Sequence, residues 1–329
     1  FLDSYKKKHR KAWLIPLFAA LLILLTVFWF GPRIVDILSA GGPGDQVSEQ
    51  EPDLIYEDSR YAVVSVPYTD LLDEPDLRSA RISQVLYNDP LKIISETDQG
   101  FIHVQLADGA KGYVMTRDAV FRTDGVEPGR FDHKLTISSK TKRIMSHASQ
   151  GSVLLEVVMG TVLFSDYGSE GVYRVALADG GHGWISSEGV IRTDVFAGPL
   201  QSNAVKFYET TLLFANSTYI SNGITVYGAS GTGIAFISAK INGVRLTRDI
   251  DGQSRAGVAV TGDPEEGDLL FFGKKDQGPA VITGMGIVVG YGKVLMSVPG
   301  RSSVSITDLS SGMLQDQVII AARRLFAGP

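Results

Sequence analysis

Cysteine is absent from this chain of 329 residues. The protein therefore forms no disulfide bond, binds no metal through thiolates and has no cysteine nucleophile. Histidine is scarce, and none of the five histidines lies after residue 200. An imidazole base and a histidine ligand for zinc are thus excluded from that region unless another part of the chain supplies them. The chain also lacks a basic surplus, since its net charge is -5, and this argues against a nucleic-acid partner.

The composition is nevertheless that of a folded protein. Apolar residues make up 44% of the chain, which is enough to build hydrophobic cores. Glycine is frequent, with 36 residues, and favours turns and β structure over helical bundles. We expect two or three domains from this length.

Residues 12–32 carry no charge and include long apolar stretches. About 20 such residues, at a rise of about 1.5 Å each, cross a bilayer core of about 30 Å as a helix. A basic cluster at 6–11 precedes the segment, so the positive-inside rule places the tail 1–11 in the cytoplasm. We therefore predict a single-pass protein of the cell membrane whose later domains are extracytoplasmic. A cleaved signal peptide is the alternative.

Residues 33–60 are rich in glycine, proline and acidic residues, which indicates an exposed linker. An internal repeat follows this linker. The tetrapeptide Leu-Ala-Asp-Gly occurs at 106–109 and again at 177–180. In both copies, alternating apolar residues come before the Asp-Gly turn, and a short strand with an aromatic residue comes after it. The pattern predicts two small β-barrels, over 61–124 and 132–194.

Each copy of the repeat contains a short motif around an aromatic residue, Gly-Tyr-Val at Tyr113 and Gly-Trp-Ile at Trp184. These motifs and the strand order resemble bacterial SH3-like domains. Two roles remain open for Tyr113 and Trp184, either as core aromatics or as residues that contact a ligand.

The region 200–329 has a different pattern. Helical spacing of apolar residues appears over 201–214, with Ser202 and Asn203 as candidate caps. Strand patterns follow near 266–272, 286–296 and 318–326. Helices before strands predict an α+β domain.

Six short blocks in this region follow one another in an informative order. They are 217–223 (STYISNG), 228–231 (GASG), 247–253 (TRDIDGQ), 267–272 (GDLLFF), 284–290 (GMGIVVG) and 296–300 (MSVPG). This order resembles the NlpC-type cell-wall cysteine peptidases, a family with a papain-like fold that cuts peptidoglycan stem peptides. SH3-like domains ahead of the peptidase domain are an arrangement of that family. The fold class expected is therefore multidomain, with one transmembrane helix, two all-β SH3-like barrels and an α+β papain-like domain.

The chain departs from the family where the resemblance places the chemistry. Ala229 stands at the nucleophile position, Gly284 at the general-base position and Met296 at the position that orients the base. A thiolate next to an oriented imidazole is what such a peptidase requires. We therefore predict a catalytically inactive homologue that binds peptidoglycan or serves as a protein scaffold. The alternative is an active endopeptidase or amidase with non-standard residues, helped by His147 or His182.

The same blocks contain polar residues that could line a ligand groove: Tyr219, Ser221, Ser230, Arg248, Asp249 and Gln253. Ser230 follows the lost nucleophile, but a serine hydrolase would need a histidine that this region lacks. We interpret Arg248, Asp249 and Asp251 as a solvated loop with a local ion pair rather than a metal site. No cofactor and no metal are expected. The expected partners are a peptidoglycan stem peptide or a protein of the cell envelope, with the membrane bound through 12–32.

Overall fold

The computed structural model describes residues 60–169, 171–197, 200, 202–274, 281–298, 300, 302–310 and 317–326. The predicted tail, the membrane segment 12–32 and nearly all of the linker lie outside these residues. Within the described ranges, no helix is both long enough and apolar enough to cross a membrane.

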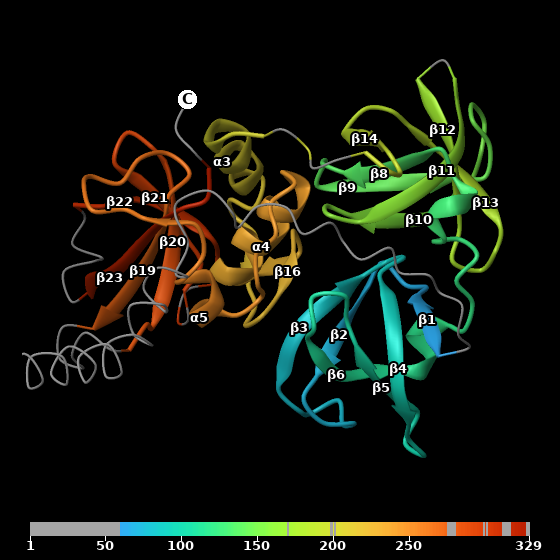
Figure 1. The fold of residues 1–329 in the computed structure, drawn as a ribbon, viewed down its shortest axis with the longest axis horizontal. Coiled ribbons are helices and arrows are strands. Elements are labelled where there is room, and N and C mark those ends of the chain that lie inside the picture. Colours follow the sequence, from blue (N-terminus) through green and yellow to red (C-terminus); the bar gives the residue numbers. More distant parts are fainter. Residues whose placement is uncertain are drawn as a thin grey trace, which may run out of the picture. The chain divides into compact units, whose positions relative to one another are not determined.

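The first SH3-like module is a seven-stranded antiparallel sheet (Figure 1). Its strands are β1 (Tyr61–Val64), β2 (Tyr68–Leu72), β3 (Arg81–Leu86), β4 (Pro90–Glu96), β5 (Phe101–Gln105), β6 (Lys111–Met115) and β7 (Ala119–Val120). They are arranged in the order β3-β2-β6-β5-β4-β1-β7. Alternate residues such as Leu71, Ile102 and Val104 point inward and are fully buried, which is the period-2 pattern that the sequence shows.

The second module repeats this architecture. Its strands are β8 (His133–Ile137), β9 (Thr141–Met145), β10 (Val153–Val158), β11 (Val162–Ser169), β12 (Val172–Ala176), β13 (His182–Ser186) and β14 (Val190–Asp194). The order β10-β9-β13-β12-β11-β8-β14 matches that of the first module strand for strand. In the two Asp-Gly turns, Gly109 and Gly180 both have φ of +86°, a conformation that favours glycine.

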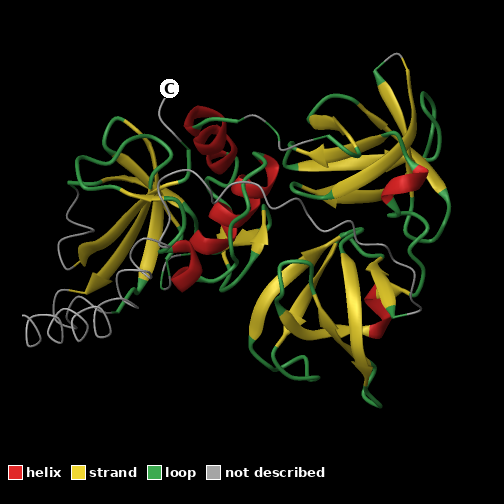
Figure 2. Ribbon diagram, viewed as in Figure 1, coloured by secondary structure: helices red, strands yellow, loops and turns green. Residues whose placement is uncertain are grey.

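The C-terminal domain contains the α-helices of the described chain. They are α3 (Ala204–Leu212), α4 (Gly231–Ile241) and α5 (Ile250–Gln253). Figure 2 also draws short helices in red outside this domain, and these are the 3-10 helices Thr116–Asp118 and Pro128–Arg130. Asn203 caps α3 by accepting a hydrogen bond from the amide of Lys206, as its sequence predicts. The helices pack with a six-stranded sheet of order β18-β23-β19-β20-β21-β22.

The strands of this domain form two sheets. The large sheet contains β18 (Val258–Ala259), β19 (Leu269–Lys274), β20 (Gly284–Gly290), β21 (Lys293–Met296), β22 (Ser305–Asp308) and β23 (Gln317–Arg324). The small sheet contains β15 (Thr218–Tyr219), β16 (Ile224–Thr225) and β17 (Gly228–Ala229), with β17 in the middle. The expectation of a β-rich, multidomain protein with two SH3-like sheets is confirmed.

Both modules contribute to the core of the C-terminal domain. Leu86 of the first module and Met159 of the second belong to the same buried cluster as Phe207 and Ile237. Gly160 allows this close approach, because a Cβ there would lie 3.1 Å from Ile237. The modules are therefore packed parts of one core rather than tethered appendages, and this packing brings the first module to the edge of the site described next.

Candidate functional site

One pocket of about 620 Å³ lies between the first module and the C-terminal domain. Its lining residues come from β3 and the Asp-Gly turn of the first module, from the small sheet, from the starts of α4 and α5, and from β20 and the segment after β21. They are Ile82, Asp108, Ala110, Tyr219, Ser221, Asn222, Ser230, Gly231, Thr232, Thr247, Arg248, Asp249, Ile250, Ile282, Thr283, Gly284, Met285 and Ser297. This volume is in the range of small-molecule and short-peptide sites.

The N-terminus of α4 forms one side of the pocket. Ser230 is its N-cap, and its Oγ accepts a hydrogen bond from the amide of Gly233 at 3.1 Å and lies 3.0 Å from Oγ1 of Thr232. Glycine is needed at 233, because a Cβ there would lie 2.0 Å from the carbonyl oxygen of Gly223. The helix start is thus held tightly against the preceding loop, with its hydroxyl groups at the pocket surface.

The three positions that the resemblance matched to a catalytic triad lie on neighbouring elements. Gly284 lines the pocket, whereas Ala229 and Met296 are buried, at 0% and 5% exposure, and are not among the lining residues. Ser297 links these elements, because its Oγ donates a hydrogen bond to the carbonyl oxygen of Ala229 at 2.7 Å. The assignment of triad positions stays a prediction.

No histidine of the described chain lines this pocket. His147 and His182, which the sequence offered as distant bases, are exposed on the second module. The two carboxylates among the lining residues are those of Asp108 and Asp249.

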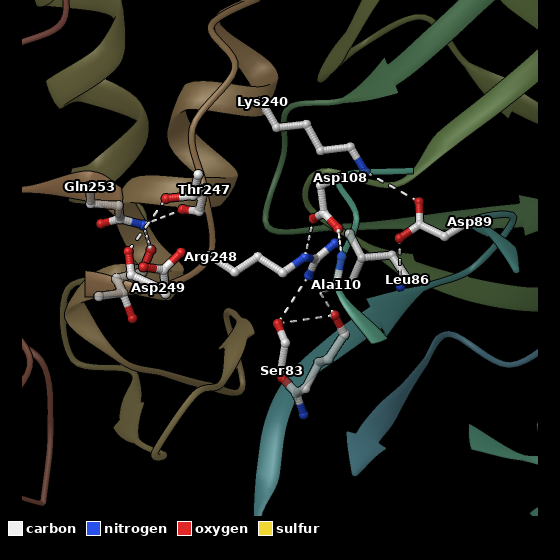
Figure 3. A network of polar contacts seen from close by, with 12 residues as sticks. Ser83, Leu86, Asp89, Asp108, Ala110, Lys240, Thr247, Arg248, Asp249 and Gln253 are labelled. Carbon is white, nitrogen blue, oxygen red and sulfur yellow. Dashed lines mark hydrogen bonds and ion pairs between the residues drawn. The ribbon is translucent and has the colours of Figure 1, made fainter. Parts of the chain in front are cut away.

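Arg248 joins the C-terminal domain to the first module (Figure 3). Its Nε forms an ion pair with Asp108, and its Nη1 donates to Oγ of Ser83 at 3.0 Å and to the carbonyl oxygen of Gln84 at 2.9 Å. Its Cζ lies 4.2 Å from the centre of the Phe236 ring. The predicted local ion pair within the loop is therefore wrong, since the charge partner of Arg248 lies 140 residues away.

Asp249 lines the pocket, as predicted, and also caps a helix. One of its carboxylate oxygens caps α5 by accepting from the amide of Gly252 at 2.7 Å. Because Arg248 is neutralised by Asp108, the carboxylate of Asp249 is left as the unbalanced charge at the pocket wall.

Five of the six predicted groove residues do line the pocket, but Gln253 does not. Its side chain is fully buried, and its Nε2 donates to the carbonyl oxygens of Thr232 and Thr247 at 2.9 and 2.8 Å. Gln253 therefore supports the pocket wall from behind.

Sequence reasoning missed the residues that the first module contributes, namely Ile82, Asp108 and Ala110. The repeat itself contained no signal for them, because Asp179 holds the equivalent position in the second module and does not line the pocket. Asp108 lines the pocket and Asp179 does not because the first module lies against this side of the C-terminal domain.

The two motif aromatics lie away from this pocket. Tyr113 stacks on His103 with ring centres 4.7 Å apart, and Trp184 meets the edge of Tyr167 at 5.9 Å. Tyr113 and Trp184 are both half-buried, and neither belongs to a hydrophobic core cluster, so a role as core aromatics is not supported. Their contact with a ligand stays a prediction.

Comparisons with known proteins agree with the motifs. Residues 71–118 match the family described as bacterial dipeptidyl-peptidase Sh3 domain. The chain is 26% identical over 208 residues to a gamma-D-glutamyl-L-lysine dipeptidyl-peptidase of Bacillus subtilis, covering 63% of this chain and 67% of that protein. It is 24% identical over 221 residues to dipeptidyl-peptidase 6 of Lysinibacillus sphaericus, covering 64% of this chain and 81% of that protein.

The fold also matches a solved structure. An NlpC/P60 family protein from Bacillus cereus superimposes with a TM-score of 0.72 at 19% identity, covering 81% of this chain and all of that one. At this identity the likeness concerns the fold.

One prediction must be corrected in the light of these comparisons. We expected a catalytically inactive protein, and this is contradicted, because the relatives are named as dipeptidyl-peptidases. The expectation rested on three residue positions transferred from a family motif, together with the absence of cysteine and of a histidine after residue 200, and these absences at the family's positions do not show that activity is lost. In sequence and in fold, the chain is a relative of the NlpC-type cell-wall peptidases that carry SH3-like domains.

Proposed function

We propose that this protein acts on peptidoglycan by receiving a stem peptide in the pocket between the first module and the C-terminal domain. The observation that supports this best is the pocket itself, with a volume of about 620 Å³. Hydroxyl groups of Tyr219, Ser221, Ser230 and Thr232 line it. Such groups both donate and accept hydrogen bonds, as recognition of peptide amides and carboxylates requires.

The substrate class follows from the relatives. The Bacillus subtilis relative is named a gamma-D-glutamyl-L-lysine dipeptidyl-peptidase. A short peptide with this linkage carries an ammonium group, and the unbalanced carboxylate of Asp249 supplies an opposite charge at the pocket wall. We therefore propose a tripeptide that contains the γ-D-glutamyl-L-lysine bond as the first ligand to test.

Hydrolysis of the bound peptide is the second part of the proposal, and the names of the relatives favour it. Because the chain has no cysteine, cleavage requires non-standard residues. Ser230 lines the pocket at the N-terminus of the eleven-residue helix α4, where the helix dipole favours a developing anion, and it is the nucleophile to test. Since no histidine of the described chain lines the pocket, a carboxylate would have to take the proton of its hydroxyl group. Asp108 and Asp249 are the carboxylates within the same pocket.

The test has a binding arm and a turnover arm. Titration calorimetry with the tripeptide should show saturable binding, and Asp249→Asn should weaken it about tenfold, since asparagine keeps the α5 cap but removes the charge. Mass spectrometry of the same mixtures should detect cleavage at the γ-D-glutamyl-L-lysine bond. Absence of both binding and products would overturn the proposed function.

A pair of variants separates chemistry from stability at Ser230. Ser230→Ala removes the hydroxyl and the cap, which costs about 1 kcal/mol of stability, whereas Ser230→Asn removes the hydroxyl and keeps the cap. Loss of turnover in both variants would support a nucleophilic serine. Loss in the alanine variant alone would assign Ser230 a structural role.

We also propose that residues 12–32 anchor the protein in the membrane and place the SH3-like modules and the C-terminal domain outside the cell. Support comes from the uncharged apolar segment and the basic cluster ahead of it. Protease treatment of intact protoplasts should digest the C-terminal domain and leave a membrane-bound N-terminal fragment. Protection of the C-terminal domain would contradict this topology.

A further inference from the structure

One glycine of the pocket wall, Gly284, is not explained by the strand in which it lies. It begins β20 and pairs with Phe272 of β19 without a break in register. Its φ lies outside the left-handed range that favours glycine. Glycine weakens a strand because it has no side chain to pack, and in a strand it often marks a bulge or the close approach of another backbone or of a ligand.

Neighbouring glycines are explained by the packing of the protein itself. A Cβ at Gly231 would lie 2.9 Å from Cγ of Met285. Two residues after Gly284 on the same strand, a Cβ at Gly286 would lie 2.5 Å from Cγ2 of Val294. Neither position has room for a side chain, because the interior around it is closely packed.

Gly284 differs from these glycines because a side chain would have room there. Among the described residues other than its two chain neighbours, the one atom within 4 Å of a Cβ at Gly284 is Cγ1 of Val298, at 3.5 Å. This is an ordinary van der Waals distance, and no other backbone approaches. Because Gly284 lines the pocket, the free space lies at the pocket wall. Of the reasons for a glycine in a strand, the approach of a ligand is the one that remains.

The surroundings of this space are uncharged. Its close neighbour is a methyl carbon of Val298, and the lining residues on either side in sequence are Thr283 and Met285. The charged residues of the lining belong instead to the Asp-Gly turn of the first module and to the start of α5. An uncharged aliphatic group can therefore be buried against Gly284 without leaving a polar group unpaired.

We propose that Gly284 is a specificity-determining residue, over which an unbranched aliphatic stretch of the ligand passes. This inference rests on the proposed function. It assigns the space to the γ-D-glutamyl unit, whose methylene groups lie in the main chain of a γ-linked peptide. These methylene groups carry no branches, so they fit against a strand surface that carries no side chain. Any side chain at position 284 occupies the same space and opposes binding.

A graded series of substitutions tests this by calorimetry with the tripeptide. Gly284→Ala, Gly284→Val and Gly284→Leu add side chains of increasing volume. Binding should weaken at each step, and for Gly284→Leu by about tenfold to hundredfold, the factors to which the energies of overpacking correspond. The melting temperatures should equal or exceed that of the native chain, since the strand loses a glycine and its own packing has room for the side chain. A purely structural role would not weaken binding while stability is kept.

Gly262 supplies the matched control. It is exposed and does not line the pocket, and no atom of the described chain lies within 4 Å of a Cβ at this position. Gly262→Leu should therefore bind the tripeptide as the native chain does.

The absence of cysteine allows a second measurement, in the full-length chain in mild detergent. Gly284→Cys introduces a single thiol, which methyl methanethiosulfonate should modify in the folded protein because the space is open. The tripeptide at about ten times its Kd should slow this reaction about tenfold, in proportion to the free fraction of the pocket. The thiol of Gly262→Cys should react at the same rate with and without the tripeptide.

The outcomes separate this inference from the proposed function. A thiol that stays unmodified in folded Gly284→Cys would show that the space is absent and would overturn the inference. Tripeptide binding by the native chain that Gly284→Leu leaves unchanged, or that does not protect the thiol of Gly284→Cys, would overturn the inference alone. Absence of binding by the native chain would overturn the proposed function and this inference with it.

Discussion

Replacement of Arg248 tests how the pocket is assembled. Its side chain is 13% exposed and joins Asp108, Ser83 and the carbonyl oxygen of Gln84 to the C-terminal domain (Figure 3). A hydrogen bond to a charged group contributes about 1.5–3 kcal/mol, but water recovers part of this at Asp108, which is 28% exposed. We therefore expect Arg248→Ala to lower the free energy of unfolding by about 3 kcal/mol.

This loss corresponds to a melting temperature lower by about 6–12 °C for a folded region of this size. Fluorescence-detected thermal unfolding measures it directly. The same variant should weaken tripeptide binding, because Asp108 and the neighbouring Ala110 form part of the pocket wall and are no longer held against the C-terminal domain.

Arg248→Lys is the matched variant for this experiment. A lysine keeps the charge opposite Asp108 but cannot reach Ser83 and Gln84 with the same fork of donors. Its melting temperature should therefore fall between those of the native protein and Arg248→Ala. The reasoning is refuted if Arg248→Ala melts within about 2 °C of the native protein, which would mean a net contribution below about 1 kcal/mol.

Two other substitutions test buried polar contacts, one between the two modules and one within the C-terminal domain. Burial raises the pKa of Tyr87 to about 12, above the ordinary value of 10.0. Because the Tyr87 phenol loses its proton at lower pH in the unfolded chain, the free energy of unfolding should fall as pH rises from 10 to 12, by up to about 1.4 kcal/mol per pH unit. Urea titrations measure this fall, and the part of it that Tyr87 causes should be absent from Tyr87→Phe. Asp268, whose side chain is 1% exposed, accepts two hydrogen bonds from Arg324 at 2.8 Å. Asp268→Asn should therefore lower the free energy of unfolding in urea by about 3 kcal/mol. Glu265, the other carboxylate paired with Arg324, is 64% exposed, so Glu265→Gln should lower it by less than about 1 kcal/mol. Equal losses in the two variants would contradict this account.

The buried contacts also explain why the SH3-like modules are more than accessories. The hydroxyl of Tyr87 in the first module accepts a hydrogen bond from the amide of Ala178 in the second at 2.8 Å. Lys240 on α4 forms an ion pair with Asp89 of the first module at 3.3 Å. Each module is therefore bonded to its neighbour, so removing the first module should expose core residues and open one wall of the pocket at the same time.

Local sequence patterns predicted the secondary structure well at turns, helix caps and strands, where the backbone geometry favours a particular type of residue. The Asp-Gly turns, the cap at Asn203 and the alternation in β5 depend on residues a few positions apart, so their physical causes lie within short windows. The order of the motif blocks likewise indicated the family that the comparisons confirm. The prediction of inactivity is contradicted by the names of the relatives, because it extended the loss of the family's usual residues to a property of the whole site.

Sequence alone determined the repeated β modules, the helix starts and the absence of any thiol chemistry, since these follow from composition and from contacts between near neighbours. Only the tertiary structure decided that Arg248 pairs with Asp108 rather than with its own loop, and that Gln253 lies behind the pocket wall. These outcomes depend on how modules distant in sequence dock, and docking is governed by the shape and charge of whole surfaces, which no short window of residues contains.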